Sequence, residues 1–380
     1  MIIVINALSA RRGGGQTYLL NLLAHIEALG DSTIYLLAPE SFDTGNRLAV
    51  KRIQINLPTE NPLIRAIWEK LFFPKLLRQL KADILFCPGG LINTDVPKGC
   101  RTVTMFRNMI PFDQAIRALY PPGLARVRNW LLKREMLASM QQADLVIFIS
   151  EYARGVIERF SSKTLKKALT IPHGISNHFR VDPLNEPLRP EGLPRGEYLL
   201  YVSIFEPYKH HLEVVRGFHR LKSMRTTHEK LLLAGKNDMP SGTAVKEEII
   251  KLGLQDDVIL IGNINYQQLP AYYRHAKINI FASGCENCPN ILLEALGAGR
   301  PLLVSNIQPM PEFGENAAIY FDPANPKDFA RQAMSIIDFP EELNRLGHLA
   351  SEQNQKYNWP ETARRTWAAF WELHQAQFLK

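Results

Sequence analysis

The chain has 380 residues, enough for two α/β domains of ordinary size. Hydrophobic residues make up 46% of it and charged residues 22%, a balance that excludes a disordered or fibrous chain. No apolar run approaches the ~18 residues of a membrane-spanning helix, and the apolar run at the N-terminus is too short for a signal peptide. Four cysteines are too few for a disulfide framework and favour a reducing, cytoplasmic location.

The formal net charge of +8 indicates an anionic partner. Nucleic acid, an anionic membrane surface and a phosphorylated substrate all fit its sign, as does a charge that only keeps the protein soluble. No nucleic-acid-binding motif or basic tail accompanies the charge. We therefore expect an anionic ligand or an anionic membrane surface, and no nucleic acid.

From end to end, apolar runs rich in β-branched residues alternate with helical patterns, which predicts parallel sheets with helices on both faces. In the first half, over residues 1–180, the expected strands are Ile2–Asn6, Thr33–Ala38, Arg52–Leu57, Ala82–Cys87, Thr102–Phe106, Leu145–Ser150 and Leu169–Pro172. The expected helices are Gln16–Leu29, Leu63–Leu80, Leu124–Gln142 and Glu151–Arg159.

Four prolines in one short polar run forbid a regular helix or a central strand, so residues 181–197 are predicted to be a linker. A second domain, 198–359, follows. Its expected strands are Tyr198–Ile204, Lys230–Ala234, Val258–Ile261, Ile278–Ala282, Pro301–Ser305 and Ala318–Phe321. Its expected helices are Leu212–Lys222, Ala244–Leu252, Gln267–His275, Pro289–Leu296, Pro326–Ile337 and Pro340–Gln355, before a last amphipathic helix from Pro360 to about Phe378.

Three glycines, Gly13, Gly14 and Gly15, stand between the first strand and the first helix. Glycines let backbone amides approach an anion closely, and the helix behind them adds the positive end of its dipole. The spacing is neither that of the dinucleotide fingerprint nor that of the P-loop. We interpret this loop as a ligand contact, with a flexible turn as the alternative.

Lys209 follows the expected strand Tyr198–Ile204 in the segment FEPYKHH. A lysine in the loop after a strand can neutralise a phosphate as a point charge. A solvated lysine is the alternative. His210 and His211 are adjacent, so they point in different directions and are poor joint metal ligands.

The stretch Phe281–Asn306 has the pattern strand, polar loop, helix, strand, with Glu286 in the loop and Glu294 in the helix. Pro289 suits the first helical turn, because its missing N–H would be unpaired there anyway. A helix start flanked by carboxylates can hold a phosphorylated sugar derivative, since its amides face phosphate and the carboxylates accept hydrogen bonds from sugar hydroxyls. An ordinary βαβ unit with two solvated glutamates is the alternative.

Metal chemistry has little support in the sequence. Cys285 and Cys288 form a C-x-x-C pair, but no second pair has zinc-ligand spacing, so two small loop residues fit better than a redox or zinc site. No Asp-x-Asp pair ends a strand, which disfavours a divalent metal on a nucleotide diphosphate. The motifs of serine hydrolases and zinc proteases are absent as well.

The region 113–142 interleaves basic and apolar residues. The basic residues are Arg117, Arg126, Arg128, Lys133 and Arg134, and the apolar ones are Leu124, Val127, Trp130 and Leu131. Such a helix could rest on an anionic bilayer. A helix packed on the core with a solvated basic face is the alternative, and the one we favour from sequence.

Together these segments resemble glycosyltransferase family 4. Glu286 and Glu294 have the spacing of its E-x7-E motif, and the following LLEALGAGRPLLVSN is similar to its usual continuation. Further segments are similar to the family in the same order: the glycine loop, FISEYAR, IPHGIS, YVSIFEPYKHHLEVVRGF, LLLAGK, VILIGNINYQQLPAYYRHA and YNWPETARR. The resemblance spans essentially the whole chain. It implies the GT-B fold, with two doubly wound Rossmann-like domains facing across a cleft and a C-terminal helix crossing back.

The resemblance also implies transfer of a sugar from a nucleoside-diphosphate sugar with retention of configuration, without a metal or cofactor. Lys209 would neutralise the donor diphosphate. Glu294 would accept hydrogen bonds from the ribose hydroxyls and Glu286 from those of the transferred sugar. The nucleotide base would lie against the backbone of Asn263 and Ile264.

Other donor contacts follow from the same resemblance. Gly14 and Gly15 would offer amides to the distal phosphate. Pro289 stands where the family has a glycine-rich loop, so Cys288 and Asn290 would supply the amides there. Arg107 stands where many members carry a histidine, and a guanidinium can steady a leaving phosphate.

The expected acceptor is a hydroxyl of a glycan or lipid-linked carrier in surface polysaccharide synthesis. The protein would work in the cytoplasm, with a peripheral contact to the inner face of an anionic membrane. A non-catalytic subunit that binds sugar nucleotides and a GT-B sugar-nucleotide epimerase stay open as alternatives.

Overall fold

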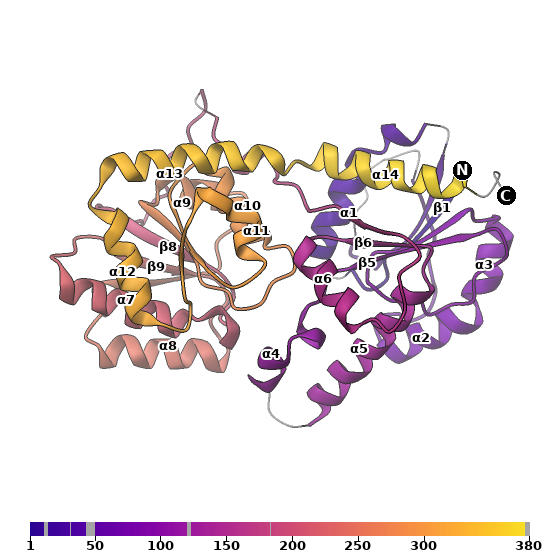
Figure 1. The fold of residues 1–380 in the computed structure, drawn as a ribbon, viewed down its shortest axis with the longest axis horizontal. Helices are drawn as coiled ribbons and strands as arrows, with labels where there is room; N and C mark the ends of the chain where they lie inside the picture. Colours follow the sequence, from indigo (N-terminus) through magenta and orange to yellow (C-terminus); the bar gives the residue numbers. More distant parts are fainter. Residues whose placement is uncertain (11–13, 31, 43–49, 120–122, 183, 377–380) are drawn as a thin grey trace. The chain divides into compact units, whose positions relative to one another are not determined.

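The structure is a computed structural model that describes residues 1–10, 14–30, 32–42, 50–119, 123–182 and 184–376 (Figure 1). Contacts divide the chain into two compact units, Met1–Gly174 with Trp359–Lys380, and Ile175–Asn358. Most of the segment expected to be a linker therefore packs with the second unit. Within the described ranges, no helix combines the length and apolar character that crossing a bilayer requires.

The first unit contains a seven-stranded parallel sheet in the order β3-β2-β1-β4-β5-β6-β7. Its strands are β1 Ile2–Asn6, β2 Thr33–Leu37, β3 Val50–Arg52, β4 Ile84–Cys87, β5 Arg101–Phe106, β6 Leu145–Phe148 and β7 Ala168–Thr170. Its helices are α1 Gly14–Ala24, α2 Pro62–Leu71, α3 Phe73–Leu80, α4 Gln114–Leu119, α5 Leu124–Gln142, α6 Glu151–Phe160 and α14 Trp359–Gln375. The order reverses at β1, as in a doubly wound fold.

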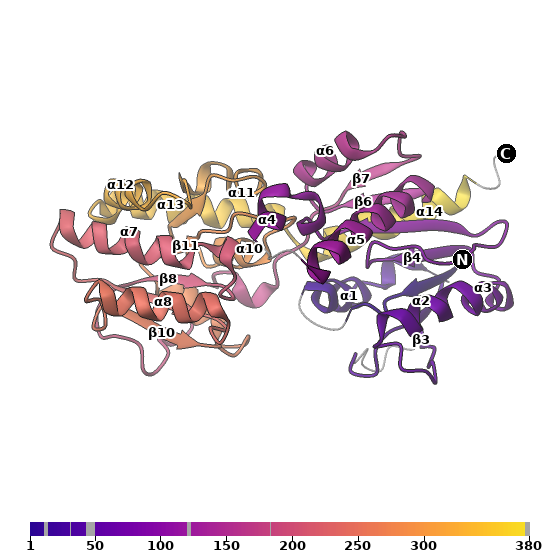
Figure 2. The ribbon, with the colours of Figure 1, turned by 90° about the horizontal axis from the view of Figure 1, so that it is seen from below.

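Helix α14 completes the first unit. It packs along α1 on one face of the sheet, while α2, α3 and α5 lie toward the other (Figures 1 and 2). Trp367 is fully buried there, and its indole N–H donates to the carbonyl of His25 at 2.9 Å. Phe370 meets Phe86 of β4 edge-to-face at 5.1 Å. The last helix therefore belongs to the core of the first unit, and the predicted end at Phe378 lies outside the described residues.

Four predictions for the first unit need correction. The helix expected over Gln16–Leu29 is α1, which ends at Ala24, followed by a short 3-10 helix Glu27–Leu29. The helix expected over 63–80 is two helices that meet at Phe72, because Pro74 has no N–H for a helical hydrogen bond and suits a first turn instead. The strand expected over 52–57 is only Val50–Arg52, at the edge of the sheet. Helix α5 is core-packed only in part: Met136 and Met140 are buried, but Leu124 is 90% exposed and Trp130 53%.

The second unit contains a six-stranded parallel sheet in the order β10-β9-β8-β11-β12-β13, which reverses at β8. Its strands are β8 Tyr198–Val202, β9 Lys230–Ala234, β10 Val258–Gly262, β11 Ile278–Phe281, β12 Leu302–Ser305 and β13 Ile319–Phe321. Its helices are α7 His211–Met224, α8 Pro240–Lys251, α9 Leu269–His275, α10 Asn290–Gly297, α11 Met310–Gly314, α12 Pro326–Ile337 and α13 Pro340–Gln353. Figure 1 shows α13 on the opposite side of this sheet from α7 and α8.

The loops after β8 and β9 are in direct backbone contact. Gly235 has a φ of +138°, and a Cβ there would lie 1.9 Å from the carbonyl oxygen of Ser203. The N–H of Gly235 donates to the carbonyl of Gly262 at 2.8 Å, which ties the end of β9 to the end of β10. Only glycine allows this approach. These contacts therefore fix the backbone of the loops at the carboxyl edge of the second sheet.

Candidate active site

The predicted donor residues of the second unit follow three strands of one parallel sheet. Lys209 comes after β8, Asn263 and Ile264 after β10, and Glu286 after β11. The carboxyl ends of parallel strands meet at one edge, so these loops share that edge. Because β8 pairs with β11, Lys209 and Glu286 are on neighbouring strands.

Lys209 and Glu286 form an ion pair between Nζ and Oε1. Lys209 ends the short helix Pro207–Lys209 and is only 5% exposed. Its backbone is held at both ends, since its N–H donates to the carbonyl of Glu206 at 2.9 Å and its carbonyl accepts from the Tyr201 hydroxyl at 2.7 Å. A buried cation of this kind needs an anionic partner, and Glu286 supplies it here.

His211, two residues after Lys209, belongs to a stack of rings. His211 stacks on Phe205 at 3.9 Å and on Tyr201 at 4.5 Å between ring centroids. Burial, with the charge of Lys209 adding to it, lowers the pKa of His211 to about 3. This histidine is therefore neutral at physiological pH, and its ring supports the Lys209 loop.

Glu294 lies on α10 in a different environment from Glu286. The Tyr266 hydroxyl donates to its Oε1 at 3.3 Å. Burial raises the pKa of Glu294 to about 8, against a smaller lowering by the tyrosine hydrogen bond. The carboxyl is therefore largely protonated at neutral pH. Tyr266 was not predicted as a site residue from the sequence, although it follows Asn263 and Ile264 within the segment that carries the resemblance.

The start of α10 differs by one residue from the prediction. The helix begins at Asn290, and Pro289 precedes it with φ −80° and ψ 82°. This is an inverse γ-turn, closed by a 3.0 Å hydrogen bond from the Asn290 N–H to the Cys288 carbonyl. The Asn290 amide predicted to meet phosphate is therefore already engaged. The described part of the chain provides no acceptor for the N–H groups of Ile291 and Leu292, which makes them the better donors.

The loop between β11 and α10 is buried. Cys285 is 7% and Cys288 9% exposed, and neither is in a disulfide. The N–H of Gly284 donates to the carbonyl of Tyr208 at 2.7 Å, which joins this loop to the one that carries Lys209. In the described residues, no group of three or more His, Cys, Asp or Glu is arranged to hold a metal ion.

The predicted residues of the first unit also meet one another. Gly14 and Gly15 open α1, and Gly13 lies outside the described residues. A Cβ on Gly15 would lie 3.2 Å from Nη1 of Arg107, which follows β5. The guanidinium also lies over the ring of buried Tyr18, 5.8 Å from its centroid. The glycine thus leaves room for the arginine beside the start of α1.

Two family models match consecutive parts of the chain. Residues 12–179 match the model described as "Glycosyltransferase Family 4", and residues 189–353 match "Glycosyl transferases group 1". Solved structures align with nearly the whole chain. Sucrose-phosphate synthase from Thermosynechococcus elongatus has a TM-score of 0.76 at 17% identity, covering 99% of both chains. WaaG, a glycosyltransferase of lipopolysaccharide biosynthesis, has a TM-score of 0.73 at 14% identity, covering 97% of this chain and 99% of its own.

The chain has the GT-B fold. This confirms the fold predicted from the resemblance, and the two family matches support an enzyme of the transferase class.

Curated relatives of this GT-B chain include two Escherichia coli proteins. A "Serotype-specific mannosyltransferase WbdA" is 25% identical over 278 residues, which are 71% of this chain and 33% of that protein. "O-antigen chain mannosyltransferase B" is 22% identical over 196 residues, half of this chain and 51% of that protein. The GT-B chain thus spans a third to a half of the length of these relatives.

Proposed function

We propose that this protein is a glycosyltransferase that moves a sugar from a nucleoside-diphosphate sugar to a hydroxyl of a glycan or lipid-linked acceptor, with retention of configuration and without a metal. The ion pair between buried Lys209 and half-buried Glu286, just before α10, carries the proposal. A related GT-B protein, HepE from Anabaena, has been solved in complex with UDP and glucose.

The donor diphosphate binds Lys209 together with the N–H groups of Ile291 and Leu292. Each is a donor to phosphate oxygen, and the helix dipole of α10 adds to them. Phosphate then takes the place of Glu286 at the lysine. The freed carboxylate accepts hydrogen bonds from the sugar, so Glu286 changes partner as the donor binds.

Bond cleavage places negative charge on the departing nucleoside diphosphate. Lys209 stabilises that charge, and Arg107 is assigned the same role in the first unit, because a guanidinium donates two parallel hydrogen bonds to phosphate. The acceptor hydroxyl gives its proton to the leaving phosphate. Glu294, through its carboxyl, binds the ribose hydroxyls.

The proposal is tested by release of nucleoside diphosphate from a panel of sugar nucleotides with a glycan or lipid-linked acceptor. Mannose nucleotides come first, because the E. coli relatives are mannosyltransferases. Lys209→Ala and Glu286→Ala should abolish release, and Lys251→Ala, at a lysine whose side chain is 73% exposed, should not change it.

Unchanged release in both site variants would contradict the proposal. Binding of a nucleoside diphosphate without turnover would identify a non-catalytic subunit instead. Turnover without acceptor to a second sugar nucleotide would identify an epimerase.

The first unit also carries a surface that fits an anionic membrane. On α2, Leu63 is 74%, Ile67 58% and Leu71 66% exposed, and these residues recur at the spacing of one helix face. The first half of α5 exposes Leu124 and Trp130 among arginines. Exposed apolar side chains beside basic ones suit the interface of an anionic bilayer. Sedimentation with vesicles of anionic lipid, and its loss in Leu124→Asp with Trp130→Asp, tests this contact.

A further inference from the structure

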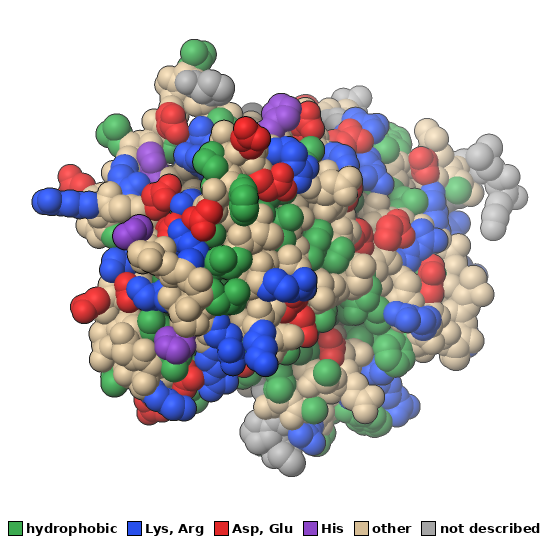
Figure 3. Space-filling view, turned by 60° about the vertical axis from the view of Figure 1, so that its left-hand side comes forward, with side chains coloured by type: hydrophobic (Ala, Val, Ile, Leu, Met, Phe, Trp, Pro, Cys, Tyr) green, Lys and Arg blue, Asp and Glu red, His purple; other side chains and the backbone are tan. Residues whose placement is uncertain are grey.

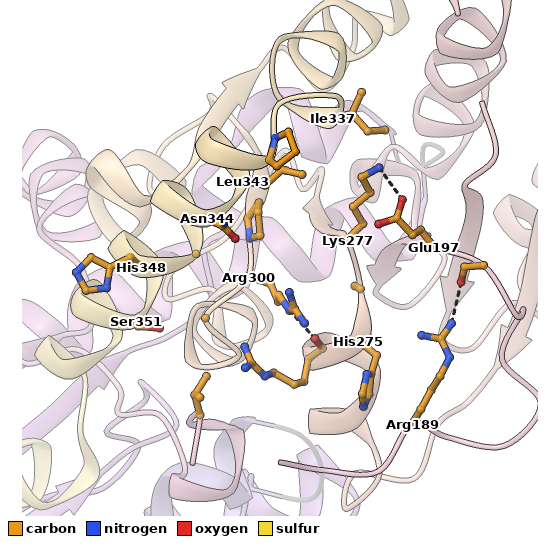
Figure 4. Close-up of a pocket in the computed structure, with 18 of the residues that line it drawn as sticks. Arg189, Glu197, His275, Lys277, Arg300, Ile337, Leu343, Asn344, His348 and Ser351 are labelled. Atoms are coloured by element: carbon orange, nitrogen blue, oxygen red, sulfur yellow. Dashed lines mark hydrogen bonds and ion pairs between the residues drawn. The ribbon is translucent and has the colours of Figure 1, made fainter. Parts of the chain in front are cut away.

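A cavity lies at the opposite edge of the second sheet from Lys209 and Glu286. It has a volume of about 1000 Å³. Glu197, Lys277 and Pro301 line it, and each directly precedes a strand: β8, β11 and β12 (Figure 4). A strand of five residues spans roughly 16 Å, so this amino edge is far from the carboxyl edge. The cavity is therefore a separate site, of a size that holds a small molecule.

The lining of this cavity is strongly basic. Arg189, Arg195, Arg274, Lys277 and Arg300 contribute five positive charges, against Glu197 and Asp338 with two negative charges. Figure 3 shows Lys and Arg side chains interspersed with Asp and Glu on the face that it brings forward. An excess of this kind inside a cavity attracts an anion.

The acidic residues near the cavity already have partners. Glu197 and Glu229 both pair with Lys277 at 2.7 Å, and Asp338 pairs with Arg225 at 2.5 Å. Glu186, from an exposed loop, pairs with Arg274 at 3.0 Å. These pairs leave Arg300 without a carboxylate: in the described ranges, it takes part in no ion pair.

Arg300 lines the cavity and is held in place by one backbone hydrogen bond. Its Nε donates to the carbonyl of Arg274 at 2.6 Å, the contact drawn in Figure 4. No acceptor for its Nη1 or Nη2 occurs in the described part of the chain. Burial, and then the neighbouring charge of Arg274, lower the pKa of Arg300. An arginine still keeps its charge, so an anion at this place would meet a half-buried cation that has no ion-pair partner in the described residues.

The backbone beside Arg300 is fixed as well. Gly299 has a φ of +59°, and a Cβ there would lie 2.4 Å from Oγ of Ser351 on α13. A Cβ on Gly347, one turn earlier on α13, would lie 2.9 Å from the Gly299 carbonyl oxygen. Asn344 and Ser351 bring polar groups from α13 to the cavity wall (Figure 4). The site is thus rigid, with neutral donors and acceptors beside the arginines.

We propose that this cavity binds a phosphate-bearing ligand, with the guanidinium groups of Arg300 and Arg274 on the phosphate. Arg300 would donate through Nη1 and Nη2. Arg274 would donate through Nη2, because its Nε donates to Glu186 and its Nη1 to the carbonyl of Ala298. The remaining volume and the polar wall of α13 suit a hydroxyl-bearing organic portion, such as a phosphorylated sugar. This inference does not depend on the proposed transferase activity.

The test is calorimetric titration of the full chain with inorganic pyrophosphate and with a hexose 6-phosphate. Lys209→Ala removes phosphate binding at the carboxyl edge, so it serves as the background. In that background, Arg300→Gln should weaken the remaining binding at least tenfold. Arg345→Gln changes an exposed arginine of α13 that pairs with Glu342, and should leave it unchanged.

Arg300→Lys keeps the positive charge but loses the planar guanidinium, so it should retain part of the affinity for phosphate. This partial retention distinguishes a lost contact from a failure to fold. Vesicles with and without phosphatidic acid form a second arm. Loss of vesicle binding in Arg300→Gln identifies a lipid phosphate as the ligand, and loss of hexose phosphate binding alone identifies a soluble one. No phosphate binding in the Lys209→Ala background, or binding unaffected by Arg300→Gln, would overturn the proposal.

Discussion

Glu294→Gln is expected to make the second unit more stable at alkaline pH. The folded protein holds this carboxyl with a pKa of about 8, raised by burial, whereas the ordinary glutamate value is 4.5. Between these values the folded state binds a proton that the unfolded chain does not. The free energy of unfolding therefore falls by about 1.4 kcal/mol for each pH unit in this window. The contribution of this carboxyl to the free energy of unfolding is fully present below pH 4.5 and is lost as pH rises to 8.

The interval from 4.5 to about 8 corresponds to a loss of roughly 4–5 kcal/mol. Glutamine does not titrate, and its amide oxygen still accepts the hydrogen bond from Tyr266. The variant should match the wild type near pH 5 and exceed it by about 2–4 kcal/mol at pH 8.5. His211 titrates with the opposite sign, but it is present in both proteins, so it cancels in the difference.

The tryptophans give this experiment an internal control. All five belong to the first unit: Trp68, Trp130, Trp359, Trp367 and Trp371. Their fluorescence in urea follows the first unit, and hydrogen exchange of the amides of β8 and β11 follows the second. Glu294→Gln should change the pH dependence of the stability of the second unit, measured by hydrogen exchange. It should leave the stability of the first unit, measured by fluorescence, unchanged. A difference between variant and wild type that is the same at pH 5 and pH 8.5 would show that Glu294 is ionised, and the reasoning from burial would fail.

Two glycine substitutions test backbone contacts. Gly235→Ala should destabilise the second unit by about 3 kcal/mol or more, because the added Cβ would meet the Ser203 carbonyl and φ of residue 235 is positive. Gly196→Ala is the control, since a Cβ there has open space. Equal melting temperatures of the two variants would refute the contact. Gly15→Ala should displace the guanidinium of Arg107 and lower kcat about tenfold, while the melting temperature changes little. An unchanged kcat in steady-state kinetics would refute the placement of Arg107 beside Gly15.

The central strands were predictable because parallel strands buried on both faces are continuous apolar runs. Ile2–Asn6 and Lys230–Ala234 have the predicted bounds. The edge strand β3 was misplaced, since an edge strand is less buried and its apolar pattern continues into the following loop. The break at Phe72 had a signal in Pro74, which the apolar periodicity of the region outweighed.

The positions of the candidate site residues were predictable from the sequence, but their protonation states and hydrogen bonds were less so. Lys209 and Glu286 could be placed at strand ends from sequence, and the order of the strands makes them neighbours. The protonation of Glu294 depends on how deeply α10 is buried and on Tyr266, which comes from another loop. The engagement of the Asn290 amide depends on ψ of Pro289, which residue types alone do not fix.

These three-dimensional details give the two glutamates different electrostatic states. Glu286 is paired with a buried lysine, so its charge is matched before any ligand arrives. Glu294 is protonated near neutrality, so it adds no charge beside the start of α10, where we propose that phosphate binds. Before a ligand arrives, neither glutamate therefore presents an unpaired negative charge at the place where a diphosphate would bind. A site with two ionised and unpaired carboxylates would repel that ligand, and the observed burial removes this conflict without losing either group as a partner for hydroxyls.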